Sequence, residues 1–95
     1  MSNVAIYYVL KQEQEYEEAV LEIENVITKI NMNIKGVYID INMKNHELLK
    51  LLNEDLSSID FLILNKDIYN EFDKALINEL SRTEKFEIKN LNELL

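Results

Sequence analysis

The sequence predicts a single α/β domain in which a doubly wound, four-stranded and mostly parallel sheet carries helices on both faces, in three layers. Short apolar runs typical of buried strands alternate along the chain with longer segments whose apolar residues recur every three or four positions. The resulting order, β-α-β-α-β-α-β, indicates a parallel sheet, because parallel neighbours need a crossover connection long enough to hold a helix. The 95 residues suffice for one modest core, so residues 1–95 are expected to form one domain.

The first half of the chain supplies two strands and the clearest helix. Residues 3–10, NVAIYYVL, are almost continuously apolar, which predicts a central strand covered on both faces. Residues 12–31 carry an apolar stripe at helical spacing, and their glutamates gather in the first half, where negative charge suits the positive end of a helix dipole. Residues 34–41, IKGVYIDI, are β-branched and aromatic enough to predict a second strand, which contains the single glycine.

The second half repeats the alternation with shorter elements. Residues 46–56 predict a leucine-rich helix, and residues 60–65, DFLILN, predict a third buried strand. We expect Asp67 to cap the next helix. Residues 85–89, KFEIK, alternate apolar and polar side chains as an edge strand does, and residues 91–95 predict a last helical turn. The apolar stripe expected for the helix after Asp67 comprises Ile68, Phe72, Ala75, Leu76 and Leu80.

The five tyrosines fall into two groups. Tyr7 and Tyr8 adjoin on the first strand and must point to opposite faces, so we expect that they do not both belong to the core and that one reaches a crevice or an interface. Tyr16, Tyr38 and Tyr69 are expected to close the edges of the core with their hydroxyl groups in water.

Composition narrows the class of function. A formal net charge of −8 disfavours direct nucleic-acid binding, because phosphate backbones are bound chiefly by lysine and arginine. The absence of cysteine excludes disulfides and thiolate metal sites, which favours a cytoplasmic location. No apolar run approaches the roughly 20 residues that span a bilayer, so we expect a soluble protein with no membrane association.

A crevice beyond the carboxyl ends of the strands is where an open α/β sheet binds ligands, and Lys11, Asp40 and Asp67 are the candidate residues there. Two carboxylates at such a place could hold Mg²⁺ or act as an acid and base pair. The alternative is that Asp40 ends a strand and Asp67 caps a helix. The turn after the first strand has no glycine, which disfavours a phosphate-binding loop. The single histidine, His46, is expected on the surface, and we assign no catalytic, metal or cofactor-binding residue and no cofactor.

Three strand segments, Ala5–Lys11, Gly36–Asp40 and Ile59–Leu64, form a recognisable framework together with Asp67 after the third strand and leucines at positions 48, 51 and 52. This framework resembles the N-terminal catalytic domain of resolvase/invertase-type serine recombinases. The resemblance covers essentially the whole chain. It implies a doubly wound fold and, if the active-site residues were present, cleavage of DNA by a serine nucleophile.

The active-site residues that the resemblance implies are missing. Asp67 matches an aspartate of the family's segment after the third strand, but the nucleophilic serine and the arginines that stabilise charge on the phosphate are replaced. The replacing residues are Val9 and Lys11 at the end of the first strand, Lys44 or Asn45 before the second helix, and Ile68 and Glu71 after the third strand. The resemblance therefore implies a catalytically inactive relative.

Three functions remain open from the sequence. The first is a non-catalytic protein-interaction module, for example a regulator from a phage or other mobile element, that meets a protein partner or a second copy. The second is a small enzyme or ligand-binding domain that uses the crevice, and the third is an acidic mimic of DNA. The partner-binding candidates are the edge strand 85–89 and the acidic helix, through Glu13, Glu17, Glu18 and Glu24.

Overall fold

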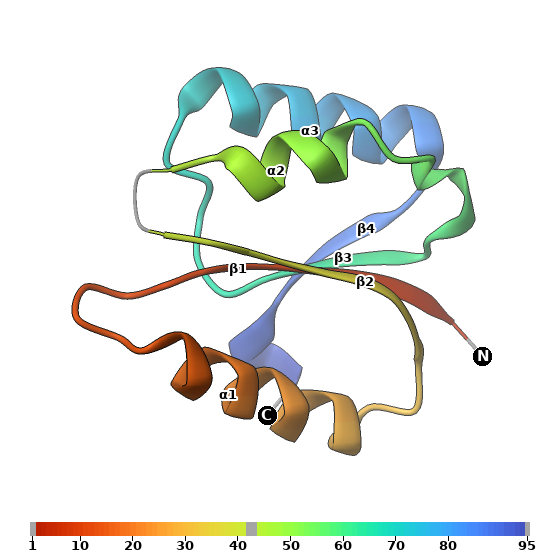
Figure 1. Cartoon of the computed structure of the whole chain (residues 1–95). Helices are drawn as coiled ribbons and strands as arrows, with labels where there is room; N and C mark the ends of the chain where they lie inside the picture. Colours follow the sequence, from red (N-terminus) through yellow and green to blue (C-terminus); the bar gives the residue numbers. More distant parts are fainter. Residues whose placement is uncertain (1, 42–43, 95) are drawn as a thin grey trace.

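A computed structural model describes residues 2–41 and 44–94 of the chain. It confirms the expected α/β fold, with strands and helices alternating along the sequence (Figure 1). The strands and helices are, in chain order, β1 (Asn3–Val9), α1 (Tyr16–Lys29), β2 (Asn33–Asp40), α2 (His46–Leu52), β3 (Phe61–Leu64), α3 (Glu71–Glu84) and β4 (Glu87–Asn90). Two short 3-10 helices, η1 (Leu56–Ser58) and η2 (Leu91–Leu94), supplement them.

The four strands form one sheet in the order β2-β1-β3-β4, and every neighbouring pair is parallel. The helix α1 and the turn η2 cover one face, which we call the α1 side, and α2 and α3 cover the other, which we call the α2/α3 face (Figure 1). The strand β1 is central and β4 lies at an edge, as the sequence predicts. Among the described residues, no helix is both long enough and apolar enough to cross a membrane.

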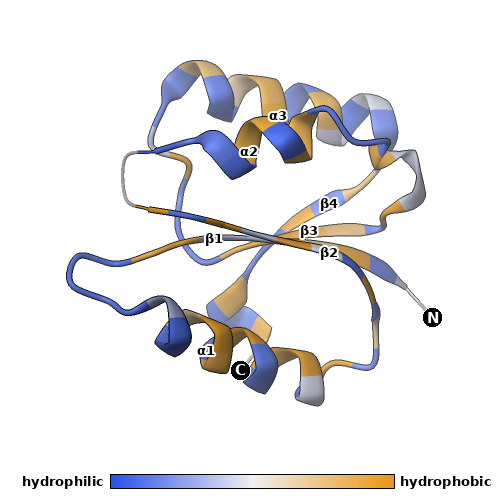
Figure 2. Cartoon of the chain, in the orientation of Figure 1, coloured by the Kyte–Doolittle hydropathy of each residue, from blue (hydrophilic) through white to orange (hydrophobic). Residues whose placement is uncertain are grey.

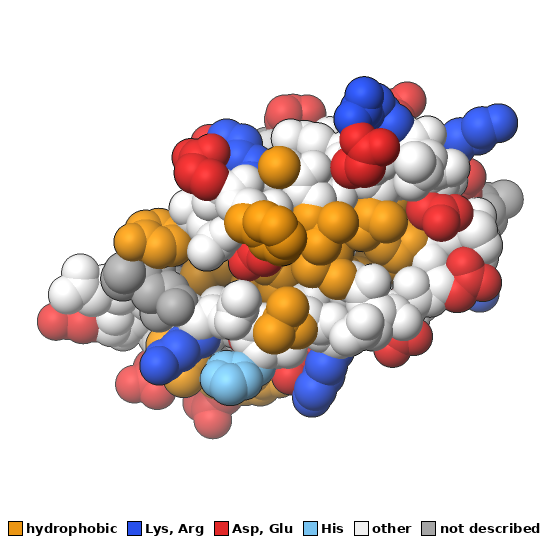
Figure 3. Space-filling view, turned by 90° about the horizontal axis from the view of Figure 1, so that it is seen from above, with side chains coloured by type: hydrophobic (Ala, Val, Ile, Leu, Met, Phe, Trp, Pro, Cys, Tyr) orange, Lys and Arg blue, Asp and Glu red, His pale blue; other side chains and the backbone are white. Residues whose placement is uncertain are grey.

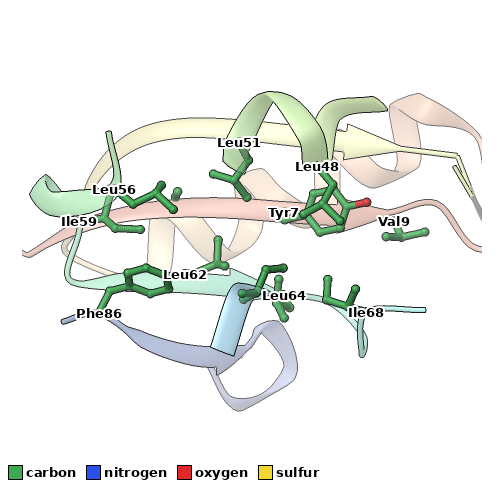
Figure 4. Packing of buried hydrophobic residues seen from close by; sticks show 12 residues of the cluster. Tyr7, Val9, Leu48, Leu51, Leu56, Ile59, Leu62, Leu64, Ile68 and Phe86 are labelled. Carbon is green, nitrogen blue, oxygen red and sulfur yellow. The ribbon is translucent and has the colours of Figure 1, made fainter. Parts of the chain in front are cut away.

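Each face of the sheet has its own hydrophobic cluster, and the apolar stripes of the helices face the strands (Figure 2). On the α2/α3 face, Leu48 and Leu51 of α2 share one cluster with side chains of β1 and β3, and Leu48 lies beside Tyr7 (Figure 4). On the α1 side, Ala19, Ile23 and Val26 pack over the same two strands. Because both faces are covered, successive residues of β1 are all buried, which explains its continuous apolar run.

The expectation that Tyr7 and Tyr8 do not both belong to the core is wrong. Tyr7 is 3% exposed in the cluster of the α2/α3 face, and Tyr8 is 0% exposed in the cluster of the α1 side. Opposite orientation does not expose either ring, because each face has its own helical cover. Tyr38 packs against the edge of a core, as expected, but Tyr16 and Tyr69 are largely exposed.

The helix α3 also differs from its expected position. It begins at Glu71, and its N-cap is Asn70, whose side chain accepts a hydrogen bond from the backbone N–H of Asp73, so Asp67 does not cap it. The helix buries Asp73 and Ile77, whereas Phe72 is 75% exposed. Ile68 and Leu80 of the predicted stripe do pack against the core, but Asp73 and Ile77 are buried in place of Phe72 and Ala75.

The strand β2 forms the long edge of the sheet. Among the strands, it pairs with β1 alone. Val4 of β1 pairs with Ile34 and the next residue, Ala5, pairs with Gly36, so Lys35 of β2 is an extra residue in the ladder. The next residue, Gly36, lies under the ring of Tyr38, where an added Cβ would approach Tyr38 Cε1 to 2.8 Å. Its φ is not positive, so the glycine serves the close approach of this ring and not an unusual backbone conformation.

Candidate functional site

At the carboxyl ends of the neighbouring strands β1 and β3, the chain leaves β1 for α1 on one face of the sheet and leaves β3 for α3 on the other. The crevice at such a point is the usual ligand site of open α/β folds. Asn65 bridges these two strand ends. Its Oδ1 accepts a hydrogen bond from the backbone N–H of Val9 at 2.8 Å, and its Nδ2 donates to the carbonyl oxygen of Val9 at 2.9 Å. The side-chain amide thus continues the ladder between the strands after the backbone pairing stops.

The loop from β1 to α1 uses its polar groups internally. The backbone N–H of Leu10 donates to the carbonyl of Asp40, and that of Lys11 donates to Oε1 of Gln14. At the start of α1, Glu15 and Glu18 form a reciprocal capping box. These pairings engage N–H groups that an anion would require, and the two glutamates place negative charge at the helix end.

Asp40 ends β2 with a buried carboxylate that is 4% exposed. The Tyr7 hydroxyl donates to its Oδ2 at 2.7 Å, and the backbone N–H groups of Glu47 and Leu48 donate at 2.9 and 3.1 Å. Asp40 thereby satisfies the first turn of α2, where the N-cap residue Asn45 makes no side-chain cap of its own. Burial, the hydrogen bond to Asp40 and the charges of Asp40 and Asp73 raise the pKa of Tyr7 far above its usual value.

The three crevice candidates have separate partners. Lys11 is exposed, and its Nζ lies 3.8 Å from Oε2 of Glu22 on the α1 side. Asp40 ends β2, as the alternative expectation for this residue stated, and its carboxylate is bonded to Tyr7 and to the backbone of α2. Asp67 is exposed in the loop before α3. No interaction given by the structure among the described residues joins these three side chains to one another.

A small pocket of about 150 Å³ lies on the α2/α3 face, between the start of α2 and the loop before α3. The buried carboxylate of Asp73 contributes to it and accepts a hydrogen bond from Nδ2 of Asn45 at 3.3 Å. Sequence reasoning identified Asp67 here but not Asp73, which lay outside the predicted stripe. The lining includes Tyr7, Lys44, Leu48, Lys66, Asp67 and Asp73.

The structure gives no sign of a metal centre in the part of the chain that it describes, since no three His, Asp or Glu side chains are grouped closely enough to hold an ion. His46 is exposed at the first turn of α2, as expected. The carboxylates of Asp40 and Asp73 are instead held by hydrogen bonds from Tyr7, Asn45 and the α2 backbone.

The acidic candidates Glu13, Glu17, Glu18 and Glu24 are exposed on or just before α1. Glu13 has a left-handed backbone conformation, with φ of 66°, and Glu18 takes part in the capping box. Beside them, α1 and the edge strand β2 leave an open trough of about 510 Å³. The trough is lined by Tyr16, Val20, Ile23, Glu24, Ile27, Val37, Ile39 and Glu47. An apolar trough with glutamates thus borders the acidic helix.

Comparisons with protein-family models, with curated proteins and with solved structures find no match to this chain.

Replacing Asn65 with alanine is expected to lower the free energy of unfolding by about 1–2 kcal/mol, because both backbone groups of the buried Val9 lose their partner. Urea denaturation measures the change. Asn53→Ala is the matched control, because the side chain of Asn53 also donates to a backbone carbonyl, but at an exposed helix end. Equal losses in the two variants would contradict a bridging role for Asn65.

Proposed function

We propose that this chain is a non-catalytic, cytoplasmic protein-interaction domain. The observation that carries the proposal is that polar side chains at the edge of the sheet where an α/β domain normally binds its ligand are bonded to the chain itself. Asn65 occupies the gap between β1 and β3, and Asp40 is committed to Tyr7 and α2. The two polar side chains that end β2 and follow β3 are therefore already bonded within the chain.

The resemblance to serine recombinases supports the same proposal, with the framework retained and the phosphate-handling groups replaced. At the positions that the resemblance assigns to the chemistry, Val9 and Ile68 are buried apolar side chains, Lys11 pairs with Glu22, and Glu71 carries a negative charge. A regulator encoded by a phage or other mobile element would be one use for such a domain.

The interaction surface that we propose is the acidic α1 side together with the trough against β2. Segment 11–29 holds six glutamates and two lysines, and the trough beside it exposes Val37 and Tyr16. A partner segment that combines basic and apolar side chains would match both properties. Such a segment could add to the free edge of β2, because an edge strand offers unpaired backbone groups.

The opposite edge is less open to strand addition. The strand β4 is four residues long, and Nζ of Lys89 lies 3.9 Å from Oε2 of Glu87 and 4.9 Å from the centre of the Phe61 ring. Short length and charged side chains are the features by which edge strands avoid pairing. We therefore place the partner at β2 and not at residues 85–89.

A titration with defined peptides tests the proposal. We expect a synthetic peptide that alternates lysine with valine to shift the backbone NMR signals of Val37, Ile39 and neighbouring residues of α1. A peptide that alternates lysine with serine has the same charge and should bind on the order of tenfold more weakly, because it cannot fill the apolar trough. Raising the salt concentration should weaken both.

Charge reversal supplies the matched controls. The variant Glu24→Lys should weaken binding, whereas Glu71→Lys, an equal charge reversal at an exposed position on α3, should retain it. Equal binding of the two peptides, or equal binding by the two variants, would contradict the assignment of the surface. A covalent protein–DNA adduct formed on supercoiled plasmid would overturn the non-catalytic part of the proposal.

The pocket on the α2/α3 face favours a second candidate function, the binding of a small ligand. Its volume of about 150 Å³ is well below the roughly 300–1,000 Å³ of ordinary ligand sites, so it would hold only a few non-hydrogen atoms. Of the three crevice candidates, Asp67 alone contributes to its lining. Saturable NMR shifts at Tyr7 and Asp73 with a small-molecule fragment library would favour this function.

A further inference from the structure

The α2/α3 face carries an apolar groove. Seen from above this face, hydrophobic side chains form a continuous band between the two helices (Figure 3). Leu49 and Phe72 are exposed on α2 and α3, Tyr69 is exposed just before α3, and Leu52 and Leu80 are only partly buried. Contiguous apolar surface of this kind marks a place where another macromolecule docks.

Charge is distributed unevenly between the two sides of the molecule. Segment 11–29, which holds α1, has six acidic and two basic side chains, whereas segments 44–54 and 66–85, which hold α2 and α3, together have seven acidic and six basic side chains. The α2/α3 face is thus close to neutral in a chain whose formal net charge is −8. Two copies of the chain would repel each other least if these faces met.

We propose that a second copy of this chain docks on the α2/α3 face and forms a twofold dimer with both acidic α1 sides directed outward. A twofold interface pairs a patch with itself, so the exposed Phe72 and Tyr69 of each copy would contact the groove of the other. A standard interface needs about 800 Å² from each partner, roughly an eighth of the 6085 Å² surface of this chain. A basic partner fits the α2/α3 face less well, because the acidic and basic side chains of this face nearly balance.

The dimer goes beyond the proposed interaction with a basic segment, and it uses a different surface. It would present two acidic sides and two β2 edges from one particle. Binding to a partner that carries two basic segments would then gain from the second contact being intramolecular.

Sedimentation equilibrium of the full chain tests the dimer. We expect a monomer–dimer equilibrium whose dissociation constant rises on the order of tenfold or more in Phe72→Asp, because a buried aromatic anchor would be replaced by a charge. The matched control is Leu21→Asp on α1, where the side chain is 60% exposed, and this variant should dimerise as the wild type does. Because both positions are exposed, each variant should unfold at the wild-type temperature when the measurement is made at a protein concentration too low for dimers to form.

Salt separates self-association from the capture of a basic partner. The dimer should become tighter as salt increases, because screening removes the repulsion between two chains of formal charge −8. A monomer at concentrations up to about 1 mM, or a dimer that is broken by Leu21→Asp and not by Phe72→Asp, would overturn the inference. Either result would leave the peptide titration on the α1 side unaffected, so the two proposals can fail separately.

Discussion

Replacing Asp40 with alanine is expected to lower the free energy of unfolding by about 3 kcal/mol. Three donors lose their acceptor at once, namely the buried Tyr7 hydroxyl and the backbone N–H groups of Glu47 and Leu48. The first turn of α2 also loses its cap, which alone costs about 1 kcal/mol. Since domains of this size have a total stability of about 5–15 kcal/mol, the loss should be plain in urea denaturation followed by circular dichroism.

A double-mutant cycle isolates the bond to Tyr7. Tyr7→Phe should destabilise the wild type more than it destabilises Asp40→Ala, with a coupling of about 1 kcal/mol. Asp67→Ala is the control for loss of a carboxylate at the same edge, and it should change stability by no more than about 0.5 kcal/mol because Asp67 is exposed. If the Asp40 and Asp67 variants lose the same stability, Asp40 does not organise this edge.

The framework of the fold was predictable because burial leaves a strong pattern in the sequence. The continuous apolar run of β1 predicted its central position, and the stripe through Ala19, Ile23 and Val26 predicted α1. The ends of α1 were less predictable. The helix begins at Tyr16 and not at residue 12, because Glu13 takes a left-handed conformation that is usually signalled by glycine or asparagine.

The candidate site was predictable in location but not in its bonding. Asp40 does lie at the carboxyl edge of the sheet, but no local pattern shows that its carboxylate reaches Tyr7 and α2. Asn65 carried a signal that could have been used, since an amide side chain directly after a buried strand can extend the backbone ladder. For Asp73, periodicity favoured its neighbour Phe72 as the buried residue, and tertiary contacts decided otherwise.

The adjacent tyrosines of β1 should make the protein sensitive to alkaline pH. Burial and the hydrogen bond to Glu22 raise the pKa of Tyr8 to about 12 from the ordinary value of 10.0, and burial and the hydrogen bond to Asp40 raise the pKa of Tyr7 further. Above pH 10.0 the unfolded chain loses these protons before the folded chain does, so the unfolded state gains stability as pH rises. The contribution of Tyr8 is therefore complete below pH 10.0 and falls by roughly 2 kcal/mol as the pH rises to 12.

Urea denaturation at a series of alkaline pH values measures this loss, and tyrosinate absorbance shows when the native rings ionise. Tyr8→Phe should flatten the fall in stability between pH 10.0 and 12, because the unfolded chain then has one less group that releases its proton early. Tyr69→Phe removes an exposed hydroxyl and should leave the profile as in the wild type. A profile that Tyr8→Phe does not change would mean that burial and the hydrogen bond from Tyr8 to Glu22 do not hold the tyrosine proton in the folded protein.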